Sequence, residues 1–231
     1  MAQQQGYDFS RLRTDKIQRV LFLLHRQHNI SRALPFYSQL LLGIEDNCRD
    51  HGIALSFLSI GPGDAVSEQV LLHQPDALIC AGFFEPELLG LLQQMKLPLV
   101  LVDLWAPGLP CVNPDNTQGG YLATQHLIAQ GRSRIAFLAS TLAHYSIRQR
   151  EKGYRQALYE ARLLMPPEYE TVAPPLLDTD QSLVEAVNEL LRLPEPPDAI
   201  LPITMRQRWL FNGCAHRQGY ADPGRSRAGG V

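Results

Sequence analysis

The sequence lacks the marks of membrane proteins, exported proteins and disulfide-rich proteins. No apolar run approaches the roughly 18–20 residues that a membrane-spanning helix requires. Residues 1–16 are polar and contain no apolar core of a secretory signal. The cysteines are isolated from one another, and Cys48 and Cys80 fall at apolar positions that predict small core residues. We therefore expect a soluble, cytoplasmic protein without membrane partners.

Signatures of catalysis, cofactor binding and metal binding are also missing. The chain has no Gly-x-Ser-x-Gly motif, no P-loop and no complete dinucleotide fingerprint. His25 and His28 have the spacing His-x-x-His, but no nearby cysteine or carboxylate completes a zinc site. The net charge of −2 provides no general attraction to nucleic acid. The sequence thus predicts no enzyme activity, no cofactor and no metal site.

One pattern occurs twice in the chain, in the same order. An apolar run is followed by a helix start and later by a Pro-Asp-Ala strand, PDALI in the first half and PDAIL in the second. Phe36 and Ser146 each stand at the helix start, seven residues before a glycine. The paired segments are 20–24 with 135–139 and 75–79 with 197–201. Two halves on one plan predict two α/β lobes with a ligand cleft at the carboxyl ends of their strands.

Apolar runs alternate with amphipathic stretches through most of the chain, which predicts mostly parallel sheets flanked by helices. The residues Phe36, Leu40, Ile44 and Cys48 recur every four positions and predict one apolar stripe on the first helix. Predicted strands are 17–24, 53–60, 77–80, 97–102, 134–140 and 199–201, and predicted helices are 35–50, 67–73, 86–95, 116–130, 149–164 and 183–193.

A family resemblance rests on two motifs in the middle of the chain. Residues 116–139 read NTQGGYLATQHLIAQGRSRIAFLA, and residues 146–157 read SIRQREKGYRQA. Together with an upstream stretch at 6–13, which looks like a linker, they resemble the lac/gal repressor family of bacterial transcription regulators. The resemblance covers roughly residues 6–202, and the motifs are specific in combination.

The resemblance implies a two-lobed sensor with the type I periplasmic-binding-protein-like fold. Such a sensor binds a small effector, a sugar or a related metabolite such as a nucleobase, and so shifts the equilibrium between operator-binding and operator-releasing states. It also allows a homodimer. Operator DNA would be contacted only through a helix-turn-helix headpiece, which we expect to be missing here. The implied parts are 1–16, a linker remnant; 17–112, an N-terminal lobe; 113–202, a partial C-terminal lobe; and 203–231, an aberrant tail.

In the first lobe, the resemblance implies effector contacts at Phe36, Tyr37 and Asp103. The two aromatic residues open the helix after the first strand, and an aromatic face suits a sugar ring or a flat base. Asp103 ends a strand, where a buried acceptor would bind hydroxyl groups. The alternatives are that Phe36 begins the apolar stripe of the core and that Asp103 caps a turn.

In the second lobe, the resemblance implies effector contacts at Arg150, with Arg148 and Ser146 beside it. A guanidinium group offers several donors in a fixed geometry, which suits hydroxyl groups or a carboxylate. The alternative is that Ser-Ile-Arg-Gln-Arg is simply a solvated helix start.

The chain departs from the family after residue 202. Residues 203–231 contain five arginines, no lysine and no glutamate, and they follow neither the strand period nor the helix period. When residues 221–231 are back-translated with freely chosen permitted codons and shifted by one nucleotide, they can encode a sequence like the family's ending, which suggests a frameshifted gene. We expect a disordered tail and an incomplete second lobe.

The favoured function is the effector-binding sensor of a repressor of a carbohydrate operon. Two alternatives stay open. A sugar-binding protein of a transport system uses a similar two-lobed fold but requires export, and a frameshifted remnant would have no function. A sugar-processing enzyme is disfavoured because the sequence offers no acid/base pair.

Overall fold

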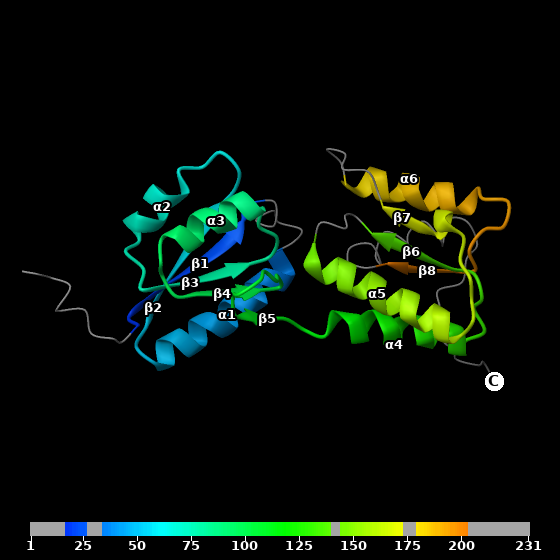
Figure 1. The fold of residues 1–231 in the computed structure, drawn as a ribbon, viewed down its shortest axis with the longest axis horizontal. Helices are drawn as coiled ribbons and strands as arrows, with labels where there is room; N and C mark the ends of the chain where they lie inside the picture. The colour runs from blue at the N-terminus through cyan, green and yellow to red at the C-terminus, as the bar shows by residue number, and fades with distance from the viewer. Residues whose placement is uncertain (1–16, 27–33, 140–143, 173–178, 203–231) are drawn as a thin grey trace, which may run out of the picture. The chain divides into compact units, whose positions relative to one another are not determined.

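The computed structural model describes residues 17–26, 34–139, 144–172 and 179–202. It divides the chain into two compact units, Met1–Asn113 and Pro114–Val231, which we call the first and second lobes (Figure 1). The predicted linker remnant and the predicted aberrant tail lie outside the described residues, as does His28.

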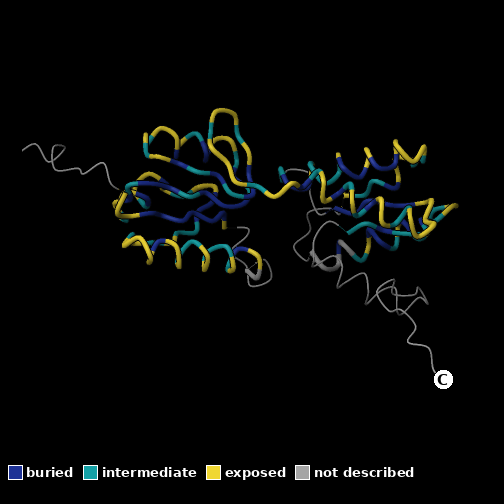
Figure 2. The backbone as a smooth tube through the Cα atoms, turned by 90° about the horizontal axis from the view of Figure 1, so that it is seen from below, coloured by how far each residue is buried: buried dark blue, intermediate teal, exposed yellow. Residues whose placement is uncertain are grey.

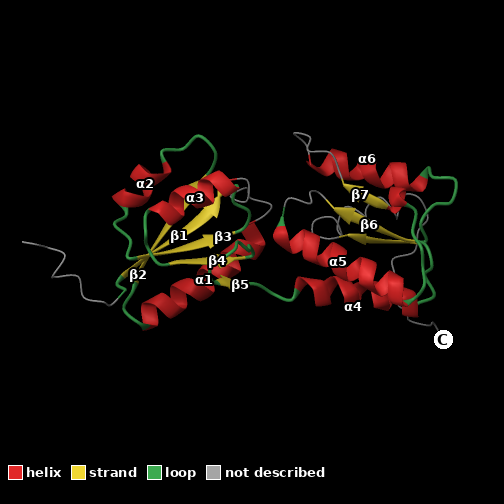
Figure 3. Cartoon of the chain, in the orientation of Figure 1, coloured by secondary structure: helices red, strands yellow, loops and turns green. Residues whose placement is uncertain are grey.

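The first lobe is a five-stranded parallel sheet covered by helices. Its elements are β1 (Arg19–His25), α1 (Leu34–Asp50), β2 (Ala54–Ile60), α2 (Val66–Leu72), β3 (Ala77–Ala81), α3 (Pro86–Gln94), β4 (Leu99–Val102) and β5 (Cys111–Val112). The strand order is β2-β1-β3-β4-β5, so the winding reverses between β1 and β3 (Figure 3). Open parallel sheets bind ligands beside the carboxyl ends of their strands at such a reversal.

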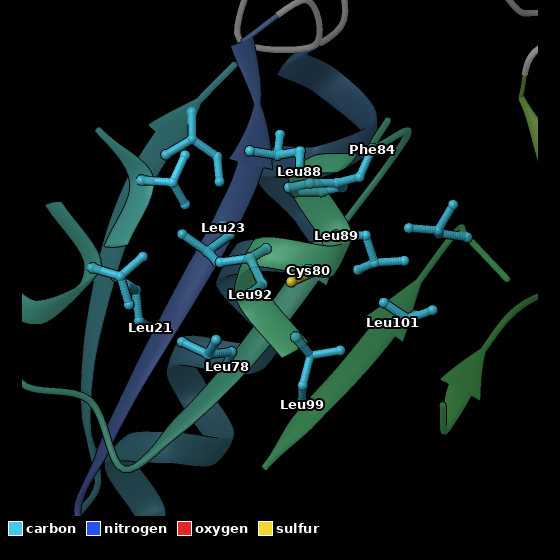
Figure 4. Packing of buried hydrophobic residues seen from close by; sticks show 14 residues of the cluster. Leu21, Leu23, Leu78, Cys80, Phe84, Leu88, Leu89, Leu92, Leu99 and Leu101 are labelled. Carbon is cyan, nitrogen blue, oxygen red and sulfur yellow. The ribbon is translucent and has the colours of Figure 1, made fainter. Parts of the chain in front are cut away.

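Alternate residues of β1 point to opposite faces of this sheet and enter two different cores. On one face, Leu21 and Leu23 pack beneath α2 and α3 in a cluster rich in leucine (Figure 4). On the other face, Phe22 and Leu24 pack against Tyr37 of α1. The strand is therefore buried on both sides, which explains why its sequence is continuously apolar.

The second lobe repeats this plan with three parallel strands. Its elements are α4 (Asn116–Ala129), β6 (Ile135–Ala139), α5 (Tyr145–Glu160), the short 3-10 helix η4 (Pro167–Tyr169), β7 (Glu170–Val172), α6 (Thr179–Leu191) and β8 (Ala199–Pro202). The order β7-β6-β8 corresponds to β2-β1-β3, so the winding reverses between β6 and β8.

The central strand of the second lobe is also covered on both faces. Ala136 and Leu138 pack beneath α6, whereas Ile135, Phe137 and Ala139 pack beneath α5 and α4. Figure 2 shows the same layering in both lobes, with buried strands inside and helices that are exposed on their outer sides. Parallel sheets with helices on both faces confirm the predicted α/β fold class.

The repeated Pro-Asp motif makes the same connection in each lobe. Asp76, ahead of β3, accepts hydrogen bonds from the backbone N–H groups of residues 18 and 19, both at 2.9 Å. Asp198, ahead of β8, accepts them from residues 133 and 134 at 3.1 and 3.0 Å. Each aspartate thereby ties the start of the central strand to its neighbour, which gives the repetition in the sequence a structural reason.

The structure corrects the predicted boundaries in three places. Helix α5 begins at Tyr145, four residues before the predicted start at 149. The short strands β5 and β7 were not predicted. The apolar stripe of α1 keeps Leu40, Ile44 and Cys48 as predicted, but Tyr37 enters the core in place of Phe36, which is exposed. Cys48 and Cys80 are buried, as predicted.

Candidate functional site

Asp103 is a buried carboxylate at the carboxyl end of β4. Only 8% of the residue is exposed, and its backbone is left-handed with φ of 56°. Few residues with a side chain adopt this conformation, and aspartate is among those that tolerate it best. The hydroxyl group of Tyr37 donates a hydrogen bond of 3.0 Å to Oδ2 of Asp103. The strained backbone and this bond together fix a carboxylate that can accept hydrogen bonds from hydroxyl or amine groups.

The two aromatic residues at the start of α1 occupy different environments. Tyr37 is 6% exposed and belongs to the core, whereas Phe36 is 58% exposed. Their rings contact edge to face, with centroids 5.0 Å apart. The alternative in which Phe36 begins the buried stripe is therefore wrong. The exposed ring of Phe36 can stack on a ligand, whereas the hydroxyl group of Tyr37 orients Asp103.

A second polar pair, which was not predicted from the sequence, joins the end of β1 to the residue before α3. Nε2 of His25 and Oε2 of Glu85 are 3.0 Å apart, and the side chain of His25 is only 5% exposed. The rings of Phe83 and Phe84 stand edge-on to the imidazole, with centroids 6.1 and 6.0 Å away. These residues flank the strand reversal of the first lobe. The signal in the sequence was the position of His25 at the end of one strand and of Glu85 in the loop after another, but only the strand order shows that those strands are neighbours.

Ser146, Arg148 and Arg150 all lie in the first two turns of α5. Ser146 is 5% exposed, Arg150 is half-buried, and Arg148 is exposed. The alternative of a fully solvated helix start is therefore wrong for Ser146. The helix follows β6, so these residues stand at the carboxyl end of the central strand of their lobe.

The structure thus groups the predicted site residues by lobe. Phe36, Tyr37 and Asp103 are joined by direct contacts in the first lobe, and the other three share the start of α5. In the described ranges, no three His, Cys, Asp or Glu side chains gather in a way that could hold a metal ion. None of the helices within those ranges has the length and apolar character needed to cross a bilayer. Asp103 is a hydrogen-bond acceptor in the first lobe, and Ser146, Arg148 and Arg150 carry hydrogen-bond donors in the second lobe.

Comparison with protein families decides the classification. The model for periplasmic binding proteins and the sugar binding domain of the LacI family matches residues 18–209. The chain belongs to this family. The match includes both lobes and all six predicted site residues.

Curated relatives of the chain are repressors. It is 30% identical over 179 residues to the HTH-type transcriptional repressor PurR of Photobacterium profundum, a match that covers 72% of this chain and 51% of the relative. It is 30% identical over 193 residues to the ribose operon repressor of Escherichia coli K12, covering 77% of this chain and 57% of that repressor. The chain thus spans about half the length of the curated relatives it matches.

Solved structures of regulators share the fold. A LacI-type regulator from Bacillus cereus subsp. cytotoxis superposes with a TM-score of 0.77 at 23% identity, over 89% of this chain and 75% of that one. The regulator CelR in complex with cellobiose superposes with a TM-score of 0.76, also at 23% identity, over 96% of this chain and 68% of that one. At this level of identity the likeness confirms the two-lobed fold that the sequence predicted.

Proposed function

We propose that this chain is the effector-binding sensor of a DNA-binding transcriptional repressor and that its effector is a sugar or a related small metabolite. Family membership and the names of the curated relatives support the repressor role. The effector would act by binding one conformation of the sensor better than the other, and so would shift the affinity of the whole protein for operator DNA. No step of this function is catalytic.

The buried carboxylate of Asp103 is the observation that carries the proposal. A buried charged group is costly unless it has partners, and Asp103 also has a strained backbone. Such features persist where the surrounding structure maintains them for a function. A hydroxyl group of a sugar could donate a hydrogen bond to the carboxylate, while the exposed ring of Phe36 could cover the C–H face of the same sugar.

The second lobe carries donors. Arg150 and Arg148 offer guanidinium N–H groups, and Ser146 offers a hydroxyl group near the start of α5. The hydroxyl groups of a sugar both donate and accept hydrogen bonds, so a sugar suits the polar groups of either lobe. A simple anion would be repelled by Asp103, which favours a neutral, hydroxylated effector over a carboxylate.

Isothermal titration calorimetry of the 231-residue chain with D-ribose, cellobiose and adenine tests the proposal. We expect weak, saturable binding of at least one of the two sugars, because an incomplete second lobe should leave this chain with poor effector affinity. Asp103→Asn removes the negative charge with little change in shape and should weaken that binding about tenfold, because hydrogen bonds to charged groups are the stronger ones. Asp46→Asn is the matched control, since Asp46 lies on the exposed side of α1, where it pairs with Arg49.

Two results would contradict this assignment. If Asp103→Asn and wild type bound the sugar equally, the site would lie elsewhere. If the chain bound neither sugar, a sugar sensor would be ruled out, and binding of adenine alone would point to a nucleobase effector. Binding of nothing would favour the remnant without function.

A transport role is the second candidate, because the family description includes periplasmic binding proteins. The two functions differ in compartment: a repressor acts in the cytoplasm, where the DNA is, and a solute-binding protein acts outside it. Fractionation of cells that express the tagged chain distinguishes them. We expect the chain in the cytoplasmic fraction, and recovery from the periplasm would favour transport.

A further inference from the structure

Helices α4 and α5 contact each other through their backbones at one crossing point in the second lobe (Figure 1). A Cβ atom added to Gly120 of α4 would lie 2.1 Å from the carbonyl oxygen of Arg150. A Cβ atom added to Gly153 of α5 would lie 2.0 Å from the carbonyl oxygen of Thr117. The contact is reciprocal. Gly120 faces Arg150, which is three positions before Gly153, and Gly153 faces Thr117, which is three positions before Gly120.

Only glycine permits this approach of the two helices. The atoms that an added Cβ would meet belong to backbone, which cannot move aside as a flexible side chain can. Restoring a contact of 3.4 Å from 2.1 Å would require a local separation of about 1.3 Å. The atom displaced first would be the carbonyl oxygen of Arg150, one of the proposed effector-binding residues.

Two hydrogen bonds hold α5 in place around the same crossing. The hydroxyl group of Thr117 donates to Oε1 of Gln149 at 3.2 Å, next to Arg150. On the side facing the sheet, the buried hydroxyl group of Tyr154 donates to the carbonyl oxygen of Ile135 at 2.8 Å. The helix is thus fixed against both α4 and β6, and its first turns have a defined position.

We propose that Gly120 and Gly153 are positioning residues for effector binding, which rests on the proposed function of the site. They set the depth at which α5 packs on α4 and thereby the position of Arg150 and Ser146 at the carboxyl end of β6. Their contribution to affinity passes through Arg150, and they do not touch the effector themselves.

Gly119 provides a matched control within the same helix. It precedes Gly120 directly, but a Cβ atom added to it would meet nothing within 4 Å. Alanine is a better helix former than glycine at such a position. Gly119→Ala therefore makes the same chemical change, one residue away, without affecting the crossing.

A double-mutant cycle on sugar affinity tests the proposal. Binding of D-ribose and of cellobiose is measured by calorimetry for wild type, Gly120→Ala, Arg150→Ala and the double variant. We expect Gly120→Ala to weaken binding about tenfold, because misplacement of a binding group by about 1 Å is enough for such a loss. In the Arg150→Ala background, Gly120→Ala should weaken binding by less than roughly twofold, because the side chain that it would misplace is no longer present. Gly119→Ala should bind as wild type does.

Additive effects of Gly120→Ala and Arg150→Ala would overturn the proposal, since a merely structural role lowers affinity in either background. Equal affinity of Gly120→Ala and wild type would overturn it as well, while leaving the proposed function intact. If wild type bound neither sugar, the proposed sugar function would fail, and this inference with it.

A second variant keeps the test decisive if Gly120→Ala does not fold. Thr117→Val removes the hydrogen bond to Gln149 at the same crossing without adding bulk. It should weaken sugar binding about threefold, again only when Arg150 is present. An equal loss in both backgrounds would contradict the positioning role.

Discussion

The two lobes share a strand order, but the side chains that we propose as effector contacts have opposite charges. In the first lobe the charged group is the carboxylate of Asp103, fixed by Tyr37. In the second lobe the charged groups are the guanidinium groups of Arg148 and Arg150 on α5. A repeated scaffold can therefore carry acceptors in one copy and donors in the other, and hydroxyl groups of a ligand suit either kind.

The lobes also differ in how their helices approach. In the first lobe, α1 packs on the sheet through side chains, and a Cβ atom added to its Gly43 would meet nothing within 4 Å. In the second lobe, α5 is pressed against α4 at Gly120 and Gly153. Glycine at the corresponding place in the two sequence copies, Gly43 and Gly153, thus serves different needs.

The largest expected difference between the lobes follows from these two glycines. Gly153→Ala should lower the free energy of unfolding by about 3 kcal/mol, because an added methyl group overlaps the backbone of α4. Gly43→Ala should raise it by about 0.5 kcal/mol through better helix propensity. Urea denaturation of both variants measures the change. Equal effects of the two substitutions would show that α4 and α5 are farther apart at Gly153 than in this structure.

The two repeated aspartates should respond differently to the same change. In the first lobe, Oδ2 of Asp76 accepts both backbone hydrogen bonds, and the single oxygen of an asparagine side chain can accept both of them. In the second lobe, Oδ1 of Asp198 accepts a bond from the N–H group of Arg134, and Oδ2 accepts bonds from the N–H group and the hydroxyl group of Ser133. Asp198→Asn turns one acceptor into a donor that faces an N–H group, so it should lower the free energy of unfolding by about 1.5 kcal/mol. Asp76→Asn should lower it by only about 0.5 kcal/mol. Thermal unfolding compares the stability of the two variants. A larger loss of stability in Asp76→Asn than in Asp198→Asn would contradict the proposed roles of the two carboxylates.

Removing the hydroxyl group from each of two buried tyrosines should have different effects, one on sugar binding and the other on the stability of the fold. Tyr37→Phe removes the donor that holds Asp103 and should weaken sugar binding about fivefold, or about 1 kcal/mol. Tyr154→Phe leaves the carbonyl oxygen of Ile135 without its donor and should instead lower the free energy of unfolding by about 1 kcal/mol. Calorimetry and urea denaturation are applied to both. Unchanged sugar affinity in Tyr37→Phe would mean that Asp103 does not depend on Tyr37 for its orientation.

The smallest expected effects concern acid stability. The hydrogen bond from Arg26 lowers the pKa of Asp64 in the first lobe, and the bond from Tyr121 lowers the pKa of Glu160 in the second. A carboxyl group whose pKa falls on folding stabilises the folded state above its unfolded pKa, and this contribution disappears as the pH drops through the folded value. In Asp64→Asn and Glu160→Gln the free energy of unfolding should therefore fall less steeply as the pH drops below about 4. Both groups are near the surface, so the change should be small, and a steeper loss in either variant would contradict the sign.

Much of the fold follows from the sequence because strands buried on both faces are continuously apolar. The run at 20–24 and its copy at 135–139 became β1 and β6, and the two Pro-Asp-Ala segments became β3 and β8. The start of α5 was misplaced because its first turn, Tyr-Ser-Ile-Arg-Gln, has little apolar periodicity. β5 and β7 have two and three residues, which is too short for an alternating pattern to appear.

The candidate site was predictable only in part. Asp103 and the start of α1 could be chosen because they follow strands, but which of Phe36 and Tyr37 faces the core depends on a rotation of one residue. The pair of His25 and Glu85 joins positions sixty residues apart, and the strand order was needed to bring them together. The backbone contacts at Gly120 and Gly153 leave no pattern in hydrophobicity, because glycine has no side chain to form one.

Chemical-shift mapping tests the central claim most directly: that the carboxyl end of β4, where Asp103 lies, binds a small hydroxylated effector. The isotope-labelled chain is titrated with D-ribose and with cellobiose while its amide resonances are followed by NMR. We expect the sugar that binds to shift the resonances around Asp103 and Tyr37 along one saturation curve. Shifts confined to the opposite ends of the strands, with none around Asp103, would contradict this claim.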